Sequence, residues 1–529
     1  MKLSWALLLA FSVLDAALAP AQPMLVPRPL SEAPSAGAFE LSGEINVVAG
    51  DPALRATADW LITALGNTPA RTLKLATERG GAAAIALQIN RTDAAISPDS
   101  EAYELSIAPR EVTISAAAPA GIARGIATLL QLADTAAVAS SSTLPALHVR
   151  DEPRYRWRGM LLDCGRHFMP LDVVKKYIDL LAYHKLNVLH WHLTEDQGWR
   201  LEVRSHPRLT EVGAWREATR DSEQPRDRDG RYGGFYTQEE VRGIVAYAAA
   251  RHVLVVPEIE LPGHAQAALA AYPQLSCAGG PFSVSTKWGV HDDVFCAGND
   301  DAFKLLEDVL SEVVELFPSP YIHIGGDEVP KTRWKACPKC QARMKSLGLK
   351  NEDELQSYFI RRVADFLKAK NRRIIGWDEI LDGGAPRGAV IQSWRGFEGA
   401  IAAARSGHEV IVSPTSHCYL DYAQVRGTGE PEFMGYLPLE EVFRFEPMPR
   451  VHGTGDAARI LGGQGNLWTE HIPASRLDYQ AFPRLCAIAE ILWSPATPRD
   501  FDEFRKRLEI HLKRLDARGV KYYRGPVAP

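Results

Sequence analysis

After about the first 20 residues, the sequence contains no apolar run near the roughly 18 residues that a membrane-spanning helix needs. It also lacks an excess of positive charge, since the formal net charge is −5 over 529 residues. A surface of this balance suits neither nucleic acid nor an anionic membrane. These absences indicate a soluble globular protein, which agrees with its 46% hydrophobic and 24% charged residues.

The sequence is also poor in cysteine pairs with metal-binding spacing. Of its seven cysteines, only Cys337 and Cys340 form a Cys-X-X-Cys pair. A structural zinc site usually requires a second such pair, which the sequence lacks. In an exported protein, Cys277 with Cys296 and Cys337 with Cys340 could instead form local disulfides, or the thiols could be inert. We therefore expect no metal site and no cofactor.

The first 21 residues are typical of a secretory signal peptide. Lys2 precedes an apolar stretch from Leu3 to Leu14, and Ala19-Pro20-Ala21 supplies small residues for cleavage. No cysteine lies near this cleavage site, so a lipid-anchored form is not expected. The sequence thus predicts export to the periplasm or the medium.

The length of the chain fits one medium and one large domain, and the pattern changes near residue 150. Residues 22–150 are rich in alanine, with a helical segment from Ala120 to Leu132. Short alternating runs predict strands at Ile85–Ile89, Tyr103–Ile107 and Val112–Ser115. We interpret this region as a small α+β domain, one half-buried sheet with helices on one face, without evident chemistry.

Residues 151–529 alternate apolar strands with amphipathic helices. The expected strands are Arg158–Asp163, Asn187–His192, Val253–Glu258, Tyr321–Asp327, Arg373–Trp377, Ala389–Trp394, Glu409–Val412 and Ile460–Trp468. The clearest helices are Leu171–His184, Gln238–Arg251, Asp301–Phe317, Glu352–Ala369 and Arg476–Leu492. This alternation predicts an α/β fold, a (β/α)8 TIM barrel, with an irregular repeat between the seventh and eighth strands.

Polar residues gather where the predicted strands end. They are Asp163, Arg166, His190, His192, Glu258, Glu260, Asp327, Glu328, Trp377, Asp378, Glu379, Trp394 and Arg395. Barrel enzymes place their active sites at this end of the strands. The adjacent carboxylates Asp327 and Glu328 suggest general acid/base chemistry, because like charges side by side can keep one carboxyl protonated near neutrality. The sequence therefore predicts an enzyme.

Several motifs that occur in order give the sequence a resemblance to a known family. They are Arg166-His167-Phe168, the stretch from His190 to Arg200, Pro262-Gly263-His264, the stretch from His323 to Glu328, Gly376-Trp377-Asp378-Glu379 and Trp468-Thr469-Glu470. The chain closely resembles the family 20 glycoside hydrolases, the β-N-acetylhexosaminidases, over nearly all of residues 22–529. The resemblance implies an exo-acting enzyme that releases terminal N-acetylhexosamine from oligosaccharides.

The resemblance also implies a retaining mechanism in which the 2-acetamido oxygen of the substrate attacks the anomeric carbon and forms an oxazolinium ion. Glu328 corresponds to the general acid and base, and Asp327 to the acceptor for the acetamido N–H. Tyr419 corresponds to the tyrosine that holds the amide oxygen. His264 and Asp196 correspond to a relay that tunes the acid. Glu195 stands where many relatives have Asp, so either acid could serve, and we prefer Asp196.

The remaining site residues would bind the sugar. By resemblance, Trp377, Trp394 and Trp468 wall the acetamide group and stack under the ring. Arg166, Asp421 and Glu470 would recognise the hydroxyls, since a guanidinium fork suits neighbouring hydroxyls and carboxylates accept from others. A structural ion pair with Asp163 is the alternative role for Arg166.

Two other functions fit parts of the pattern. A metal-dependent barrel hydrolase could use His190 and His192, which share a strand face, together with His264 and His323. It would leave the tryptophans and the Asp-Glu pair without a role. A non-catalytic sugar-binding protein on the same scaffold is the second alternative, although the full set of catalytic residues is present.

Overall fold

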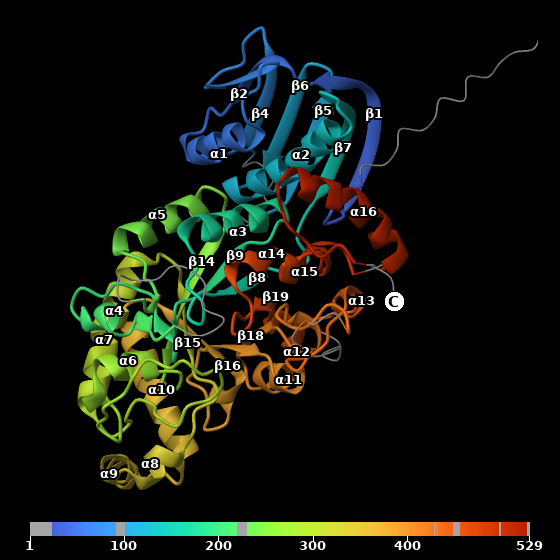
Figure 1. The fold of residues 1–529 in the computed structure, drawn as a ribbon. Coiled ribbons are helices and arrows are strands. Elements are labelled where there is room, and N and C mark those ends of the chain that lie inside the picture. Colours follow the sequence, from blue (N-terminus) through green and yellow to red (C-terminus); the bar gives the residue numbers. More distant parts are fainter. Residues whose placement is uncertain are drawn as a thin grey trace, which may run out of the picture.

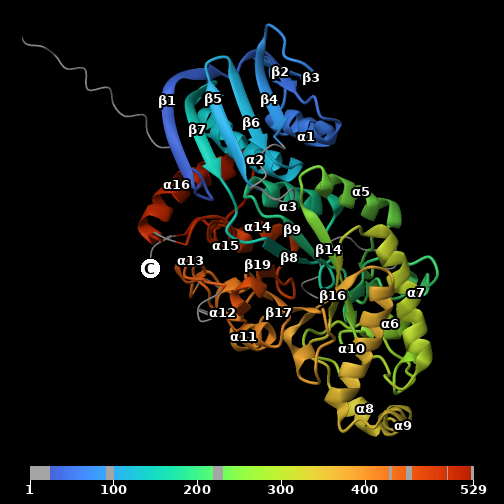
Figure 2. The same ribbon diagram turned by 180° about the vertical axis from the view of Figure 1, so that it is seen from behind.

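The computed structural model describes residues 24–90, 101–218, 230–427, 430, 432–447, 455–496 and 499–525. The predicted signal peptide, residues 1–21, lies outside them. In this part of the chain, no helix is both long and apolar enough to cross a membrane. The described residues form an N-terminal sheet with two helices and a barrel ringed by helices (Figures 1 and 2).

The N-terminal sheet is mixed, and its helices α1 and α2 lie side by side on one face (Figure 1). Buried and exposed residues alternate along β5, as expected for a half-buried sheet. The helix predicted to end at Leu132 continues to Val138, because the following alanine-rich stretch retains high helix propensity. The sheet order is β1-β7-β5-β6-β4-β2-β3. The bounds are β1 Ser31–Glu40, β2 Gly43–Val48, α1 Arg55–Leu65, β3 Arg71–Ala76, β4 Ala83–Ile89, β5 Tyr103–Ala108, β6 Glu111–Ala116, α2 Pro119–Val138 and β7 Thr143–Asp151.

Eight parallel strands then close into a barrel, which confirms the predicted TIM-barrel class. The strands in chain order are β8 Trp157–Asp163, β9 Val188–His192, β14 Leu254–Leu261, β15 Tyr321–Gly325, β16 Arg373–Trp377, β17 Val390–Ser393, β18 Glu409–Val412 and β19 Ile460–Leu467. β15 ends before the predicted Asp327 because Gly325 and Gly326 have φ angles of 64° and 87°, outside the β region.

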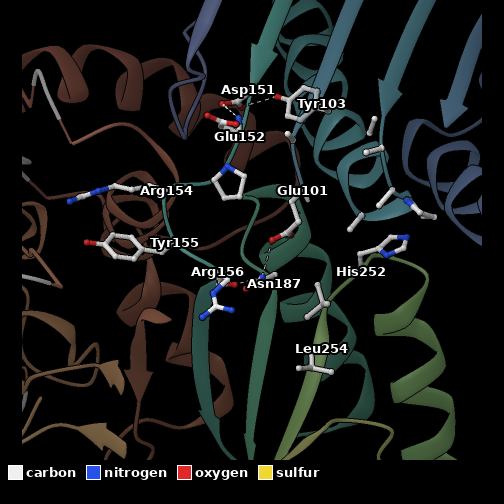
Figure 3. Close-up of a pocket in the computed structure, with 18 of the residues that line it drawn as sticks. Glu101, Tyr103, Asp151, Glu152, Arg154, Tyr155, Arg156, Asn187, His252 and Leu254 are labelled. Carbon is white, nitrogen blue, oxygen red and sulfur yellow. Dashed lines mark hydrogen bonds between the residues drawn. The ribbon is translucent and has the colours of Figure 1, made fainter. Parts of the chain in front are cut away.

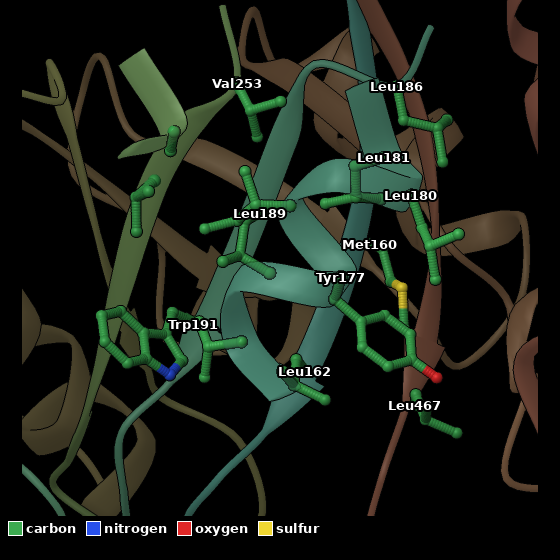
Figure 4. Packing of buried hydrophobic residues seen from close by; sticks show 14 of the residues in the cluster. Met160, Leu162, Tyr177, Leu180, Leu181, Leu186, Leu189, Trp191, Val253 and Leu467 are labelled. Carbon is green, nitrogen blue, oxygen red and sulfur yellow. The ribbon is translucent and has the colours of Figure 1, made fainter. Parts of the chain in front are cut away.

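Helices cover the outside of the barrel. Apolar side chains of α3 pack against the outward-facing side chains of β8 and β9, as Figure 4 shows for Tyr177, Leu181, Met160 and Leu189. The long helices between strands are α3 Leu171–Tyr183, α5 Gln238–Ala249, α7 Asp300–Leu316, α10 Glu352–Ala369 and α11 Glu398–Arg405, and α16 Phe501–Ala517 follows the last strand. Helices α3, α5, α7 and α10 lie close to the positions predicted for them.

Two helical regions are irregular. Between β18 and β19, the described residues form the short helices α12 (Thr415–Cys418) and α13 (Leu439–Phe443) and the 3-10 helix η4 (Gly455–Arg459), in agreement with the predicted irregular repeat. The helix expected at Arg476–Leu492 is instead split into α14 (Leu477–Ala481) and α15 (Arg484–Trp493). Pro483 causes the break, because proline lacks an N–H and disfavours helical geometry at the residue before it.

A cavity of about 1130 Å³ separates the N-terminal sheet from the barrel (Figure 3). It lies at the N-terminal ends of β9 and β14, the end of the barrel opposite the predicted carboxylate pair. Ion pairs beside it tie the two units together, since Oε1 of Glu101 lies 2.7 Å from guanidinium nitrogens of both Arg124 and Arg158. This cavity is therefore part of the junction between the units, away from the predicted chemistry.

Candidate active site

Side chains inside the barrel change from apolar to charged toward the C-terminal ends of the strands. The lower layer consists of Trp157, Val188, Val256, Ile375, Val390, Ile411 and Leu461. Because strand side chains alternate, the next inward positions of β9 and β14 are His190 and Glu258, followed by His192 and Glu260. The apolar layer closes the barrel floor, and the polar residues face the mouth.

Glu258 lies at the centre of the first charged layer and is fully buried. Its carboxylate lies 2.7 Å from Nδ1 of His323 and 3.1 Å from Nε2 of His190, and it also pairs with His192. The indole N–H of Trp377 donates to it over 2.9 Å. Three of the four histidines that suggested a metal-dependent hydrolase, His190, His192 and His323, thus contact one buried carboxylate.

The charges in this layer follow from those contacts. Burial opposes ionisation of Glu258, but the neighbouring imidazoles of His323, His192 and His190 hold its pKa well below the usual range. Burial also opposes a charge on His192, but Glu258 and Glu195 raise its pKa to about 10. His190 has a pKa lowered to about 4 by burial and stays neutral. The layer thus contains a buried ion pair of Glu258 and His192.

The carboxylate pair follows a turn that only glycine can form. A Cβ atom on Gly325 would lie 1.7 Å from Oε2 of Glu260, so a side chain there would collide with this buried carboxyl group. The turn leaves Asp327 largely covered, with 14% of its side chain exposed, whereas 38% of the Glu328 side chain is exposed. Two adjacent acids thereby enter different environments.

His264 joins this pair to a second pair of acids. Its Nε2 lies 3.5 Å from Oε2 of Glu328 and 3.6 Å from Oδ2 of Asp327. Its Nδ1 lies 2.7 Å from Oε1 of Glu195 and 3.1 Å from Oδ2 of Asp196. Both acids belong to a tight hairpin, β10 (Thr194–Glu195) with β11 (Gly198–Trp199). The structure brings the predicted Asp196 to His264, and it adds Glu195 at a shorter distance.

The two carboxyl groups of the pair differ in pKa. Burial raises the pKa of Asp327 to about 6, and the charges of Glu258, Glu328 and Glu195 act in the same direction. The hydrogen bond with His264 lowers the pKa of Glu328. Below about pH 6, the free protein therefore keeps the proton of the pair on Asp327, because Asp327 is the more buried of the two.

Aromatic residues stand at the mouth of the barrel. Trp377, Tyr419 and Trp468 are buried in one cluster, and Trp394 is half-buried against it. The ring centroids of Trp377 and Trp468 lie 5.7 Å apart, and those of Trp394 and Tyr419 lie 6.2 Å apart in a stacked arrangement. All four predicted aromatic residues are thus brought together above Glu258.

Arg166, Asp421 and Glu470 lie on one side of this cluster. The guanidinium of Arg166 stacks over Trp468, 5.0 Å from the ring centroid, and lies 3.5 Å from Asp163 and 3.7 Å from Glu470. The alternative ion pair with Asp163 therefore exists, but Arg166 contacts the other acids as well. Asp421 is 3% exposed, and burial together with the charge of Glu470 raises its pKa well above the usual value.

Three acids in the site have larger roles than the sequence indicated. Glu195 contacts both His264 and Arg166, Glu379 accepts from the indole N–H of Trp394 over 3.0 Å, and Glu260 fills the space beside Gly325. Burial raises the pKa of Glu379 to about 8 and that of Glu260 well above its usual value. Each of them stands within or beside a motif that the sequence already marked, which is the signal that could have identified them.

Comparison with known proteins places this geometry in a family. The model described as glycosyl hydrolase family 20, catalytic domain, matches residues 155–496, and that of domain 2 of the same family matches residues 22–152. A β-hexosaminidase from Porphyromonas gingivalis is 43% identical over 94% of this chain, which spans 64% of that relative's length. A β-N-acetylhexosaminidase from Cellulomonas fimi is 33% identical over 95% of this chain and 96% of its own.

Solved structures agree. The exo-β-N-acetylglucosaminidase of Vibrio harveyi in complex with N-acetylglucosamine is 35% identical, with a TM-score of 0.83 over 95% of this chain and 78% of its own. The N-acetyl-β-hexosaminidase of Streptomyces plicatus is 32% identical, with a TM-score of 0.83 over 96% of this chain and 97% of its own. The chain belongs to glycosyl hydrolase family 20 and is therefore a glycoside hydrolase.

Proposed function

We propose that the chain is an exo-acting β-N-acetylhexosaminidase that hydrolyses terminal, non-reducing N-acetylhexosamine residues from β-glycosides. One observation carries this proposal: several buried polar atoms have no hydrogen-bond partner among the described residues. They are Nε and Nη1 of Arg166, Oδ1 of Asp327, both carboxylate oxygens of Asp421 and Oε2 of Glu470. Buried polar groups normally have partners, so these atoms indicate a ligand rich in hydroxyl and amide groups.

The aromatic cluster supports a sugar as that ligand. The faces of a sugar ring are apolar and its edges polar, which suits indole rings flanked by a guanidinium and carboxylates. The Vibrio harveyi relative in complex with N-acetylglucosamine supports the same substrate class. Arg166, Asp421 and Glu470 together would enclose the hydroxyls at the far edge of one sugar, which favours cleavage of terminal residues. Natural substrates would be chitooligosaccharides or glycans.

The substrate would supply the nucleophile. The acetamido oxygen attacks the anomeric carbon, the glycosidic bond breaks, and Glu328 transfers its proton to the departing oxygen. Tyr419 holds the acetamido oxygen, and Asp327 accepts the N–H and stabilises the positive charge that develops in the oxazolinium ring. Glu328 then takes a proton from water, whose oxygen attacks the same carbon from the vacated face. The bond between that carbon and the acetamido oxygen breaks, which restores the acetamide. Two inversions give net retention of configuration.

This mechanism requires the proton of the pair to move to Glu328 when substrate binds. A sugar over the pair would cover the exposed part of the Glu328 side chain, and burial raises the pKa of a carboxyl group. The amide N–H of the substrate would at the same time favour ionised Asp327, because it donates a hydrogen bond to the carboxylate. His264, held by Glu195 and Asp196, would orient Glu328 and accompany this transfer.

The primary test is hydrolysis of the p-nitrophenyl β-glycosides of GlcNAc and GalNAc, with the β-glucoside as a control. We expect cleavage of at least one acetamido sugar and none of the glucoside, since glucose lacks the internal nucleophile. Binding of chitobiose without turnover over hours would instead indicate the sugar-binding alternative. Activity is expected to survive a chelator under native conditions, and its immediate loss would favour the metal-dependent alternative.

A second test concerns the acid and the nucleophile. Glu328→Gln should abolish cleavage of natural disaccharides but retain more activity on aryl glycosides, whose leaving groups need little protonation. A thiazoline analogue of GlcNAc should inhibit strongly because it resembles the cyclic intermediate. Labelling of a protein carboxylate by a fluorosugar would contradict this route and indicate a two-carboxylate mechanism.

We also propose export to the periplasm or the medium, on the basis of the apolar N-terminal stretch and its small-residue cleavage site. Cell fractionation with N-terminal sequencing of the purified protein tests this. We expect the protein outside the cytoplasm with its first residue at about position 22. Retention of residues 1–21 in a cytoplasmic fraction would contradict it.

A further inference from the structure

Four of the seven cysteines converge at a position that the proposed mechanism does not use. Cys277 and Cys296 belong to the loop after β14, and Cys337 and Cys340 follow β15. Sγ of Cys340 lies 3.7 Å from that of Cys277 and 3.6 Å from that of Cys296, which lies 3.7 Å from that of Cys337. All four sulfurs lie within 4.8 Å of one another.

This arrangement contradicts the expected local disulfides. None of the seven cysteines is in a disulfide, and a sulfur–sulfur bond would require a distance of about 2.05 Å. The sequence argument against zinc rested on the missing second Cys-X-X-Cys pair. The fold replaces that pair with two cysteines far apart in the same loop, Cys277 and Cys296.

The distances fit a tetrahedron around a metal ion. Zinc binds thiolates at about 2.3 Å, and four ligands at tetrahedral corners then lie about 3.8 Å apart. The three measured separations, from 3.6 to 3.7 Å, are close to this edge length. Inert thiols packed in a core have no reason to place four sulfurs at mutual distances of this kind.

The local backbone is built to bring these residues together. Cys337 stands between α8 (Thr332–Ala336) and α9 (Pro338–Leu347), which places Cys340 in the first turn of α9. A Cβ atom on Gly298 would lie 2.2 Å from the backbone of Lys339, so glycine permits the two segments to touch.

We propose that Cys277, Cys296, Cys337 and Cys340 bind one Zn²⁺ in a closed, structural site. Four protein thiolates leave no open position for substrate or water, so the ion takes no part in hydrolysis. An S₄ tetrahedron also suits iron, but zinc is the usual occupant of isolated structural sites of this kind. The inference does not depend on the proposed function.

The site would fasten together two segments that the active site needs. The loop after β14 carries His264, and the segment after β15 begins with Asp327 and Glu328. The same two segments are joined by the indole N–H of Trp334, which donates to the carbonyl of Phe295 over 3.0 Å. Helices α8 and α9 lie at the end of the molecule opposite the N-terminal sheet (Figures 1 and 2). There the ion would hold the two segments together in place of a larger hydrophobic contact between them.

Elemental analysis of the purified full-length protein tests the proposal. We expect one zinc per chain, and we expect a mercurial reagent to release it as four thiols react. Cys296→Ser should lose the zinc, whereas Cys418→Ser, a buried cysteine outside the cluster, should retain it. Removal of the ion with a chelator under mild denaturation should lower the melting temperature, and added zinc should restore it.

Three results would overturn the proposal: wild-type protein that contains no stoichiometric metal, stoichiometric iron in place of zinc, or disulfides among the four cysteines in the intact mass. Because these measurements use the wild-type chain, a variant that fails to fold does not remove the test. Loss of hydrolysis with zinc and fold intact would count against the proposed function only.

Discussion

Two layers inside the barrel both contain buried carboxylates but differ in the partners that surround them. In the first charged layer, the carboxylate of Glu258 is surrounded by three imidazoles and an indole N–H. In the layer at the mouth of the barrel, polar atoms of Arg166, Asp421 and Glu470 have no hydrogen-bond partner in the described part of the chain. A carboxylate that has partners on several sides stabilises the scaffold, whereas carboxylates and a guanidinium that lack them are available to a ligand.

The largest effect should come from breaking the satisfied layer. Glu258→Gln would remove one of the two carboxylates that balance the buried charge of His192 and leave only Glu195. Breaking a buried ion pair typically costs about 3–5 kcal/mol of stability. We expect the urea midpoint to fall accordingly. Glu379→Gln is the matched control, because the pKa of Glu379, raised to about 8, already keeps it neutral at pH 7. Equal losses in the two variants would mean that the buried charge is not what matters.

A change in the unsatisfied layer should affect rate rather than stability. Asp327→Asn removes the acceptor that stabilises the developing charge, and we expect kcat to fall by about 10²–10³ with a smaller change in KM. The melting temperature should be unchanged or higher, since a buried group surrounded by like charges is removed. A rise in KM alone would make Asp327 only a binding residue. Tyr419→Phe should behave like Asp327→Asn in kcat.

Arg166 combines both features, because it lies beside three acids while two of its nitrogens have no hydrogen-bond partner among the described residues. Arg166→Lys retains the charge beside Glu195 and Glu470 but loses the planar fork that would hold two hydroxyls. Hydrogen bonds to charged groups contribute about 1.5–3 kcal/mol, so we expect KM to rise roughly tenfold or more. Unchanged KM in steady-state kinetics would assign Arg166 to the scaffold, with Asp163 as its partner.

The smallest expected effect is a difference between the pH dependence of kcat/KM and that of kcat. In the free protein, the carboxylate pair should lose its shared proton as pH rises through about 6, the value to which the pKa of Asp327 is raised. kcat/KM, which reports the free enzyme, should therefore decline above that pH. kcat should decline only at higher pH, because bound substrate buries Glu328 and raises its pKa. If kcat and kcat/KM declined at the same pH, bound substrate would leave Glu328 as exposed as in the free protein.

The sequence predicted the fold well because each barrel strand is a short apolar run between turn signals. All eight strands were located, and the clearest error, the continuous helix at Arg476–Leu492, came from neglecting Pro483. The site residues came from ordered motifs, and the structure brings them to one end of the barrel. Local pattern and fold agree here, as they do in most natural sequences.

What the sequence could not supply depends on contacts between distant segments. Burial decides which member of the carboxylate pair has the higher pKa. The side chain of Asp327 is 14% exposed and that of Glu328 is 38% exposed, a difference that two adjacent residues in a sequence do not reveal. The position of Glu195 against His264 arises from a hairpin that crosses the mouth. The cysteine cluster likewise joins loops that follow different strands, so spacing along the chain could not show that these four cysteines meet.

Both residues of the contact between His264 and Glu328 have a left-handed backbone, with φ angles of 45° and 47°. In this region a non-glycine residue carries a cost of about 1–3 kcal/mol. Glycine would relieve that cost at either position. Laboratory evolution that selects for heat resistance alone would therefore tend to replace Glu328 and His264 by glycine. Such an experiment should include a screen for turnover.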